Sequence, residues 1–517
     1  MIGMDLSASV RASAARNGAA PAVHCDGQSL TFAELDERAC RLANALAALG
    51  VKRGEVVAML SDNCLETVEQ LTGVGLGGYV TAPLYTHSTA ESNLYLLDLV
   101  RASALIVHAG LYPAIAPVLG DAAALRHVIV FGGPAPQGTI SYESALAAAA
   151  AEDPGPVLDD DAPHIIRFSA GTTGKPKGIL HSVARWRAMA TEMSLIMPAL
   201  TDRDKYLAAG PLAHAALMPL APTLAAGGSV VVMPAFDPAR FIELVERQRC
   251  TITLLVPTMI QMIVALPQAR TADLTSLRAV FYGAAPISEQ TLVEALAVWG
   301  NIMYQLYGQS EAMPLTVLGP AEHVGRRLRS AGRPAPNAVI RIVDPHGEDV
   351  APGQVGEIAG RTPAAMAGIW RNDEATAARL LADGSVLTGD MGYFDEDGFL
   401  YFADRKDDMI ISGGTNIWPA ELENALASHP AVAEVAVVGV SHEKWGQTPK
   451  AVVVLRPGHR VDERELIDWS RQKVGAVKKI TSVEFTDALP KSGVGKVLRR
   501  EVKRRFDQSG EGAIAGA

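Results

Sequence analysis

The sequence predicts an α/β fold with a large N-terminal domain of layered sheets, a β-rich subdomain and a small α+β C-terminal domain. Two observations support this prediction. Short β-rich runs alternate with helical patterns along most of the chain, and near residue 333 the sequence pattern changes to one of short strands and turns. The length of 517 residues agrees, because single domains usually contain roughly 100 to 200 residues.

The first strong element is an amphipathic helix that begins after Thr31 and ends at Gly50. Thr31 can cap the helix, and the apolar residues that follow recur near helical spacing. Further along, β-rich runs occur at residues 55–60, 104–109, 127–131, 229–233 and 251–256. Their alternation with helical segments favours largely parallel sheets.

The C-terminal part begins after the β-rich region, which covers about residues 333–401 and carries Asp-Pro-His-Gly and Asp-Glu-Asp-Gly turns. A helix is expected from Pro419, strands at 433–440 and 450–457, and a second helix from Asp462. We therefore expect an N-terminal domain at 1–406 and a C-terminal domain at 407–517.

Composition excludes several classes of protein. The chain has 46 Lys and Arg residues against 56 Asp and Glu residues, a net charge of −10, and no long basic run, so nucleic acid is not an expected partner. The uncharged stretch at 206–236 is interrupted by prolines and a glycine pair, so no membrane span is expected. The N-terminus does not resemble a signal peptide.

The cysteines indicate the compartment. Cys25, Cys40, Cys64 and Cys250 are isolated in the sequence, without a CxxC pair or a neighbouring histidine at metal-ligand spacing. Neither a disulfide framework nor a zinc site is expected. A reducing, cytoplasmic location fits best.

A phosphate-binding loop is predicted at residues 169–178, SAGTTGKPKG, directly after the apolar run HIIRF. Glycines let backbone N–H groups approach a phosphate, hydroxyls donate further hydrogen bonds, and lysines neutralise charge. The P-loop pattern fails, because Ser169 stands at its first glycine position and Pro176 follows Lys175. A flexible surface loop is the alternative.

This segment resembles the phosphate loop of the adenylate-forming superfamily, which includes acyl- and aryl-CoA synthetases, firefly luciferase and peptide-synthetase adenylation domains. Other signatures of that superfamily follow in its usual order: YGAAP at 282–286, YGQSE at 307–311, GEIAGR at 356–361, TGD at 388–390, DRKDDMIISGG at 404–414 and PKSGVGK at 490–496. The resemblance spans nearly the whole chain and is strongest to aryl-CoA ligases of the 4-chlorobenzoate:CoA ligase type.

The resemblance implies an ATP-dependent carboxylic acid:CoA ligase that uses ATP, Mg²⁺ and coenzyme A. Attack of the carboxylate oxygen on the α-phosphate gives an acyl adenylate and releases pyrophosphate, and a thioester with CoA then forms. Because the site must bring two anions together, electrostatic stabilisation by metal and lysine is the dominant requirement.

By resemblance, ATP should be bound mainly by the phosphate loop, the two YG loops and the ribose-binding pair. These residues are Ser169, Gly171, Thr172, Thr173, Gly174, Lys175, Lys177, Gly283, Ala284, Ala285, Tyr307, Gly308, Ser310, Asp390 and Arg405. Tyr307 should stack on adenine, and Asp390 should bind the ribose hydroxyls, although it could instead be a plain turn residue.

The metal and the catalytic lysine are also assigned by resemblance. Glu311 should hold Mg²⁺ against the phosphates together with Thr172, unless Glu311 merely caps a helix. Lys496 should bridge the carboxylate and the α-phosphate during adenylation. A chain that only binds nucleotide is disfavoured, because Lys496, Glu311 and Asp390 are all present.

The CoA half-reaction depends on the C-terminal domain. Asp407 aligns with the hinge position of the superfamily, and Asp408 could be confused with it. Gly413 and Gly414 would line the pantetheine tunnel. Trp445 would lie near the CoA nucleotide, and its alternative is a plain core residue.

The acid is predicted from the segment PLAHAALM at 211–218, which holds no carboxylate, so an amino acid is disfavoured. His214 resembles the gate residue of aryl and acyl ligases, and a hydrogen-bonded core histidine is its alternative. Small and flexible apolar residues would form the pocket: Ala215, Ala216, Met259, Met262, Ala284 and Met313.

An aryl acid is the first choice of substrate, and a medium-chain or branched acyl group is the alternative. Free CoA is slightly favoured over a carrier-protein pantetheine as acceptor, because no insertion is evident near the hinge. A homodimer is possible.

Three departures from the superfamily pattern occur. Ala170 stands where many relatives have Ser or Thr, so one hydroxyl towards phosphate is absent. Val477 and Ile480 replace a common aromatic and proline, which weakens the case for stacking on the CoA adenine. Asn337 replaces a usual glycine, with no consequence that the sequence reveals.

Overall fold

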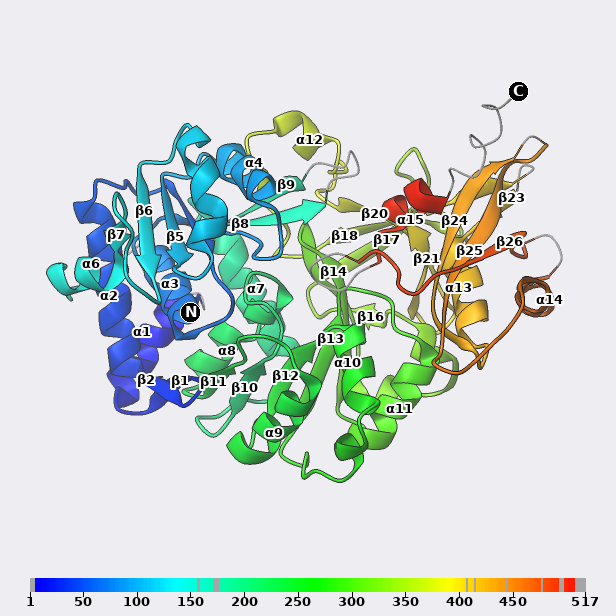
Figure 1. The fold of residues 1–517 in the computed structure, drawn as a ribbon, viewed down its shortest axis with the longest axis horizontal. Helices are drawn as coiled ribbons and strands as arrows, with labels where there is room; N and C mark the ends of the chain where they lie inside the picture. The colour runs from blue at the N-terminus through cyan, green and yellow to red at the C-terminus, as the bar shows by residue number, and fades with distance from the viewer. Residues whose placement is uncertain are drawn as a thin grey trace. The chain divides into compact units, whose positions relative to one another are not determined.

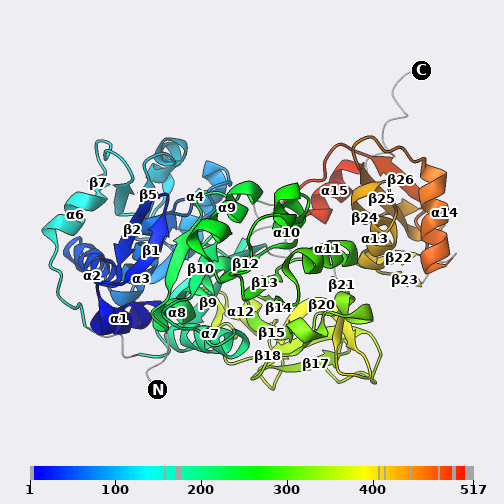
Figure 2. The same ribbon diagram turned by 90° about the horizontal axis from the view of Figure 1, so that it is seen from below.

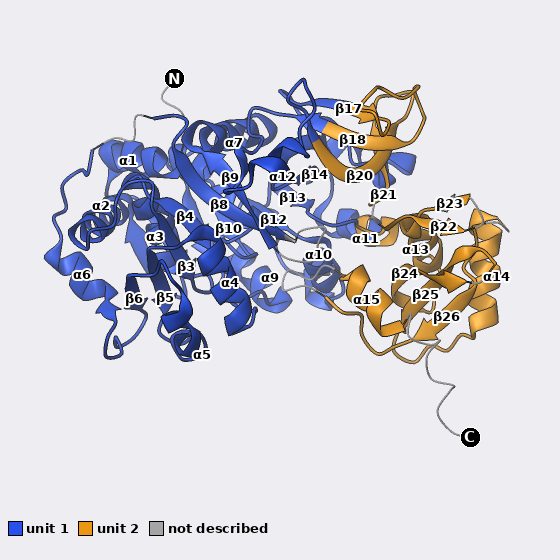
Figure 3. Cartoon of the chain, turned by 90° about the horizontal axis from the view of Figure 1, so that it is seen from above, with its two compact units in different colours: residues 1–286, 293–340, 360–386 blue, residues 287–292, 341–359, 387–517 orange. Residues whose placement is uncertain are grey.

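The structure is a computed structural model that describes residues 5–155, 159–170, 176–405, 408–412, 415–442, 444–475, 478–491 and 497–506. The ribbon is shown in two views in Figures 1 and 2. The chain divides into two compact units, coloured in Figure 3: residues 1–286, 293–340 and 360–386 form unit 1, and residues 287–292, 341–359 and 387–517 form unit 2. The predicted domain boundary after residue 406 stays a prediction.

The larger sheet of unit 1 has nine strands within the described ranges, in the order β16-β15-β14-β13-β12-β10-β11-β1-β2. Neighbours from β14 to β1 pair in parallel, and the remaining pairs are antiparallel. The strands are β1 (Pro21–Cys25), β2 (Gln28–Thr31), β10 (Lys205–Ala208), β11 (Ser229–Val232), β12 (Ile252–Leu255), β13 (Ala279–Gly283), β14 (Met303–Gln309), β15 (Ala312–Leu318) and β16 (Arg333–Pro334).

A second sheet of unit 1 has eight strands in the described part, ordered β19-β9-β8-β4-β3-β5-β6-β7. Its strands are β3 (Val56–Leu60), β4 (Val80–Pro83), β5 (Ala104–His108), β6 (His127–Phe131), β7 (Ile140–Ser141), β8 (Pro163–Ala170), β9 (Pro176–Ser182) and β19 (Gly368–Ile369). Strands β8 and β9, both cyan in Figure 1, form an antiparallel pair.

One hydrophobic core joins the two sheets of unit 1. It combines buried residues of β1 and β10 to β14 with residues of β3 and β8, and with apolar faces of intervening helices. The α-helices around these sheets are α1 (Leu6–Asn17), α2 (Phe32–Ala48), α3 (Leu65–Leu76), α4 (Ala90–Val100), α5 (Tyr112–Ile115), α6 (Tyr142–Ala148), α7 (Val183–Ile196), α8 (Leu220–Ala225), α9 (Pro238–Gln248), α10 (Pro257–Val264), α11 (Glu289–Trp299) and α12 (Asp373–Ala377).

Short 3₁₀ helices complete the connections of unit 1: η1 (Ala116–Asp121), η2 (Ala215–Leu217), η3 (Pro267–Arg270), η4 (Pro320–Glu322) and η5 (Gly325–Arg329). The predicted helix after Thr31 is α2. Its start is a reciprocal capping box, in which the Glu34 N–H donates to Thr31 Oγ1 at 3.2 Å and the Thr31 N–H donates to Glu34 Oε2 at 2.8 Å. The five predicted strands are also confirmed, as β3, β5, β6, β11 and β12.

Unit 2 contains most of a four-stranded sheet, ordered β17-β18-β20-β21, and a compact α+β part. In the latter, α13 and α14 pack on a sheet ordered β23-β22-β25-β24, with β26 paired to β25. These elements are β17 (Val339–Val343), β18 (Gly356–Arg361), β20 (Val386–Phe394), β21 (Leu400–Arg405), β22 (Ile410–Ser412), β23 (Thr415–Ile417), α13 (Pro419–Ala427), β24 (Val432–His442), β25 (Gly446–Leu455), α14 (Glu463–Val474), β26 (Ser482–Phe485) and α15 (Arg499–Phe506).

The predicted C-terminal helices are confirmed as α13 and α14, and Asp462 caps α14 as expected by accepting from the Glu465 N–H at 2.8 Å. Across the described residues, none of the helices is both long and apolar enough to traverse a bilayer.

Candidate functional site

The phosphate-loop motif joins β8 to β9. Ser169 and Lys177 lie opposite each other in the antiparallel pair, so the loop between them is held at its base by a hairpin. Gly171, Thr172, Thr173, Gly174 and Lys175 lie outside the described residues. Their phosphate contacts, and the metal contact of Thr172, therefore stay predictions.

The first YG loop follows β13 and begins at a glycine that the packing requires. A Cβ on Gly283 would lie 2.2 Å from the carbonyl oxygen of Leu306, so only glycine permits the close approach of β14. The next residue, Ala284, has a φ of 66°, in the left-handed region that an alanine occupies at a cost of about 1 kcal/mol or more. Ala284 is exposed and Ala285 is half-buried.

The second YG loop is the turn between β14 and β15, and it carries Glu311. A Cβ on Gly308, near the end of β14, would lie 2.8 Å from the carbonyl oxygen of Ala312, so glycine is required at this position as well. Glu311 follows Ser310 in a hairpin turn and begins no helix. The helix-cap alternative for Glu311 is therefore wrong.

Glu311 is brought to the base of the phosphate loop. Its side chain accepts a hydrogen bond from Ser169 Oγ at 3.4 Å, although the two residues are 142 positions apart. Its carbonyl oxygen accepts from the Met366 N–H at 2.8 Å. The Ser310 carbonyl accepts from His181 Nε2 at 2.9 Å. The turn is thus anchored on both sides, with a 9% exposed carboxylate beside the loop.

Glu311 fits the role of a magnesium ligand. No group of three or more His, Cys, Asp or Glu side chains in the described ranges could hold a metal ion. Mg²⁺ is commonly bound by one or two carboxylates together with substrate phosphates, so Glu311 would share the ion with bound nucleotide. The metal would supply Lewis-acid polarisation of the phosphates.

His214 precedes η2 and stacks on Tyr85, with ring centroids 4.9 Å apart and planes inclined by 18°. Tyr85 is fixed in turn, because its hydroxyl donates to the Phe168 carbonyl at 2.6 Å. Burial, and secondly the charge of Arg167, lower the pKa of His214 to about 4. The ring is therefore neutral at pH 7, and it makes no side-chain hydrogen bond to any described residue. The alternative of a hydrogen-bonded core histidine is not supported.

Two residues of the predicted acid pocket, Ala215 and Ala216, follow His214 directly in the chain. Ala215, Ala216 and Met313 belong to the same hydrophobic core. Met259 approaches Gly210, where an added Cβ would lie 3.8 Å from Met259 Cε and 3.7 Å from Ala216 Cβ. Met262 is 48% exposed and is not part of this core.

The predicted ribose-binding pair lies on neighbouring strands of unit 2. Asp390 in β20 and Arg405 in β21 are directly opposite, and Arg405 Nε lies 2.8 Å from Asp390 Oδ1. Asp390 is 2% exposed and sits inside a strand, so the alternative of a turn residue is wrong. The hydroxyl of Thr388 donates to the Ile358 carbonyl at 2.7 Å and fixes the strand beside it.

The hinge and lysine predictions fall largely outside the described residues, namely Lys496, Asp407, Gly413 and Gly414. Asp408 is described, and its carboxylate lies 3.0 Å from Arg499 Nη1, while Arg499 Nε donates to Glu423 Oε1 at 3.0 Å. Asp408 is therefore linked to α15 directly and to α13 through Arg499, and the hinge role of Asp407 stays a prediction.

Trp445 lies in the turn between β24 and β25 and is 46% exposed, with Lys444 Nζ 4.8 Å from its ring centroid. The alternative that Trp445 is a plain core residue is wrong. Ile480 is fully buried in the core of the α+β part, so it cannot stack on an adenine.

Sequence reasoning missed three residues near the site: Tyr85, Arg167 and His181. Only Arg167 left a signal, as a single charge inside the apolar run HIIRF. It also missed the partner of Asn337, whose amide donates to the buried carboxylate of Glu192 at 2.8 Å.

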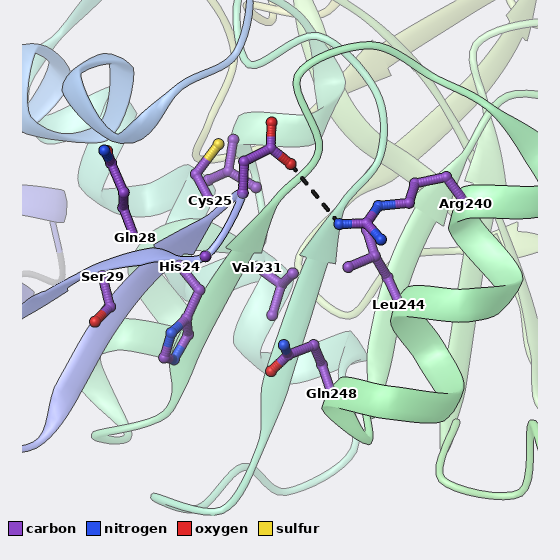
Figure 4. Close-up of a pocket in the computed structure, with 11 residues that line it drawn as sticks. His24, Cys25, Gln28, Ser29, Val231, Arg240, Leu244 and Gln248 are labelled. Carbon is purple, nitrogen blue, oxygen red and sulfur yellow. Dashed lines mark ion pairs between the residues drawn. The ribbon is translucent and has the colours of Figure 1, made fainter.

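A separate pocket of about 150 Å³ lies away from these residues, between the β1–β2 turn, β11 and α9 (Figure 4). Its one ion pair among the drawn residues joins Asp26 and Arg240 at 3.8 Å. None of the motif residues lines this pocket, so it is not part of the candidate active site.

Comparison with known proteins assigns the family. The AMP-binding enzyme model matches residues 10–370, and the model of the AMP-binding enzyme C-terminal domain matches residues 421–496. The chain belongs to the AMP-binding enzyme family. The predicted superfamily and fold class are thereby confirmed.

Among curated relatives of this AMP-binding enzyme, a feruloyl-CoA synthase of Amycolatopsis sp is 39% identical over 94% of this chain and 96% of its own. A medium/long-chain-fatty-acid–CoA ligase of Mycobacterium tuberculosis is 36% identical over 94% of this chain and 87% of its own. The ATP-bound crystal structure of MatB from Rhodopseudomonas palustris superposes with a TM-score of 0.89 at 27% identity, covering 98% of this chain and 99% of that one. This AMP-binding enzyme is an ATP-dependent, AMP-forming acid:CoA ligase, as its motifs predicted.

Proposed function

We propose that this ligase activates a hydrophobic aryl acid and transfers it to free CoA. The observation that carries the proposal is the Tyr85–His214 stack, in which the histidine is neutral at pH 7 and is followed in the chain by residues of an apolar core. A flat aromatic acid extends such a stack and buries its ring among Ala215, Ala216 and Met313. The feruloyl-CoA synthase relative, named for an aryl acid, supports the same choice.

Adenylation would use the anchored carboxylate of Glu311 and the phosphate loop on one side, and the His214 segment on the other. Ser169 connects the first two of these, because its hydroxyl contacts Glu311 and the phosphate loop follows it in the chain. Asp390 and Arg405 would bind the ribose hydroxyls. Lys496 would bridge the carboxylate and the α-phosphate, and Trp445, exposed at its turn, would contact CoA.

An experiment with a matched substrate pair tests the proposed acid. 3-Phenylpropionate and phenylalanine differ only in the α-ammonium group, and octanoate represents the medium-chain alternative. Burying an unpaired ammonium costs several kcal/mol, so kcat/KM for pyrophosphate release should be at least about 100-fold higher for 3-phenylpropionate. Preference for phenylalanine or octanoate over every aryl acid would contradict the proposal.

The acceptor is tested in the same assay by comparing CoA with a phosphopantetheinylated carrier protein. Thioester formed only on the carrier protein would contradict the choice of free CoA. His214→Ala should lower adenylation of the aryl acid while leaving the Kd of ATP nearly unchanged, because the histidine meets the acyl end. His346→Ala, at an exposed turn, is the matched control.

A further inference from the structure

Arg167 is a buried cation with unused hydrogen-bond donors. It lies in β8, two residues before Ser169, and is 7% exposed. Its Nε and Nη1 are buried, and neither donates a hydrogen bond to any described residue. Burying a charged group whose hydrogen bonds are incomplete costs several kcal/mol, so these two open donors require an explanation.

The neighbours of Arg167 place it in the candidate active site. Alternation along β8 puts Arg167 on the same face as Ser169, whose hydroxyl contacts Glu311. Burial lowers the pKa of Arg167, whereas Tyr85 and the carboxylate of Glu311 act in the opposite direction. Arg167 in turn contributes to the lowered pKa of His214. The charge of the guanidinium therefore interacts electrostatically with both Glu311, the predicted metal ligand, and His214, the predicted acid gate.

A purely structural role does not account for this residue. An arginine that stabilises a fold is usually hydrogen-bonded through its planar fork to carboxylates or carbonyls. Arg38 shows this arrangement elsewhere in the chain, with Nη2 donating to Glu69 at 3.2 Å and to Glu143 at 2.7 Å. Arg167 has a single carboxylate near it, and its Nε and Nη1 remain available.

We propose that Arg167 is an oxyanion-binding residue of the adenylation site, whose free N–H groups bind an oxygen of the bound carboxylate or of the nucleotide phosphates. The site brings together these two anions, and a fixed guanidinium offsets their mutual repulsion without reorganisation. The inference rests on the proposed function, because it takes the pocket beside His214 to be the acid site.

The test measures each ligand separately. Calorimetry gives the Kd of AMP alone and of the preferred acid alone, for the full-length enzyme and for Arg167→Met and Arg167→Lys. A lost charge-assisted contact should weaken binding about 10- to 100-fold in Arg167→Met. Weaker acid binding identifies the carboxylate as the ligand, and weaker AMP binding identifies the phosphate. Arg167→Lys should restore part of the loss, because it keeps the charge but not the fork.

Stability separates this role from a structural one. Methionine removes a poorly paired buried cation, so the Tm of the unliganded Arg167→Met enzyme should not fall. Arg247→Met, at a side chain that is 73% exposed on α9, controls for the loss of one positive charge. A lower Tm with both Kd values unchanged would overturn the proposal. If the wild-type enzyme activates no aryl acid, the proposed substrate fails, and the AMP measurement still decides the role of Arg167.

Discussion

Glu311→Gln is the most direct perturbation of the site, because it removes one charge while preserving shape. The glutamine oxygen can still accept the hydrogen bond of Ser169, and the turn keeps its backbone bond from the Met366 N–H. Two unit charges 4 Å apart attract by about 4 kcal/mol at an effective dielectric constant of 20, and a divalent ion doubles this value. Desolvation of the carboxylate offsets much of the gain.

We therefore expect Glu311→Gln to lose about 3 to 4 kcal/mol of transition-state stabilisation, which corresponds to a 10²- to 10³-fold lower rate of pyrophosphate release. The rate is measured as a function of Mg²⁺ concentration, and the half-saturating concentration should rise. Glu37→Gln removes a 54% exposed carboxylate paired with Arg41 and serves as the control. An unchanged rate and magnesium dependence would refute the assignment of Glu311 as the metal ligand.

Three further predictions concern the lysine, the hinge and the histidine. Lys496→Ala should lower adenylation about 10²- to 10³-fold and leave thioester formation from a supplied acyl adenylate largely intact; equal loss of both steps would contradict the assignment. Asp407→Pro should fix φ near −65° and slow thioester formation but not adenylation in single-turnover assays, and unchanged rates would place the hinge elsewhere. The pKa of His214 is lowered to about 4 in the folded state, whereas an imidazole in the unfolded chain has a pKa near 6.5. The contribution of the neutral ring to the free energy of unfolding is therefore complete above pH 6.5 and is lost as pH falls towards 4. Denaturant unfolding should show that, between pH 7.5 and 5, the free energy of unfolding falls by about 2 kcal/mol more for the wild type than for His214→Gln. Equal decreases would contradict the shifted pKa.

The elements that the sequence predicted well are those with local signals. The capping box at Thr31 and Glu34 fixes the start of α2, and the runs at 127–131 and 229–233 are recognisable from β-branched residues alone. Sheet order could not be predicted, because it depends on contacts far apart in the chain. Strand β1, for example, pairs in parallel with β11, about 200 residues later.

The candidate site, like the fold, has features that local sequence signals predict and others that depend on contacts between distant parts of the chain. Motif order indicated that Ser169 and Glu311 serve one reaction, but their contact depends on how β8, β9 and the β14–β15 turn pack. At Asp390 and Trp445 only the bland alternatives were wrong, because Asp390 lies in a strand rather than a turn and Trp445 is exposed rather than in a core. Asn337 had no evident consequence until the structure placed its amide on the buried carboxylate of Glu192.

The charges around the predicted acid pocket give a fuller reason than the sequence did to expect that an amino acid is a poor substrate. The sequence offered only the absence of a carboxylate in the segment at 211–218. The structure adds a buried cation, Arg167, whose charge already acts on His214. An incoming ammonium would therefore meet repulsion as well as desolvation, whereas an incoming carboxylate would meet the charge that Arg167 provides. On this proposal, the same buried guanidinium that is costly in the free enzyme would favour the anion that the reaction requires, and its charge would disfavour a zwitterion of equal size.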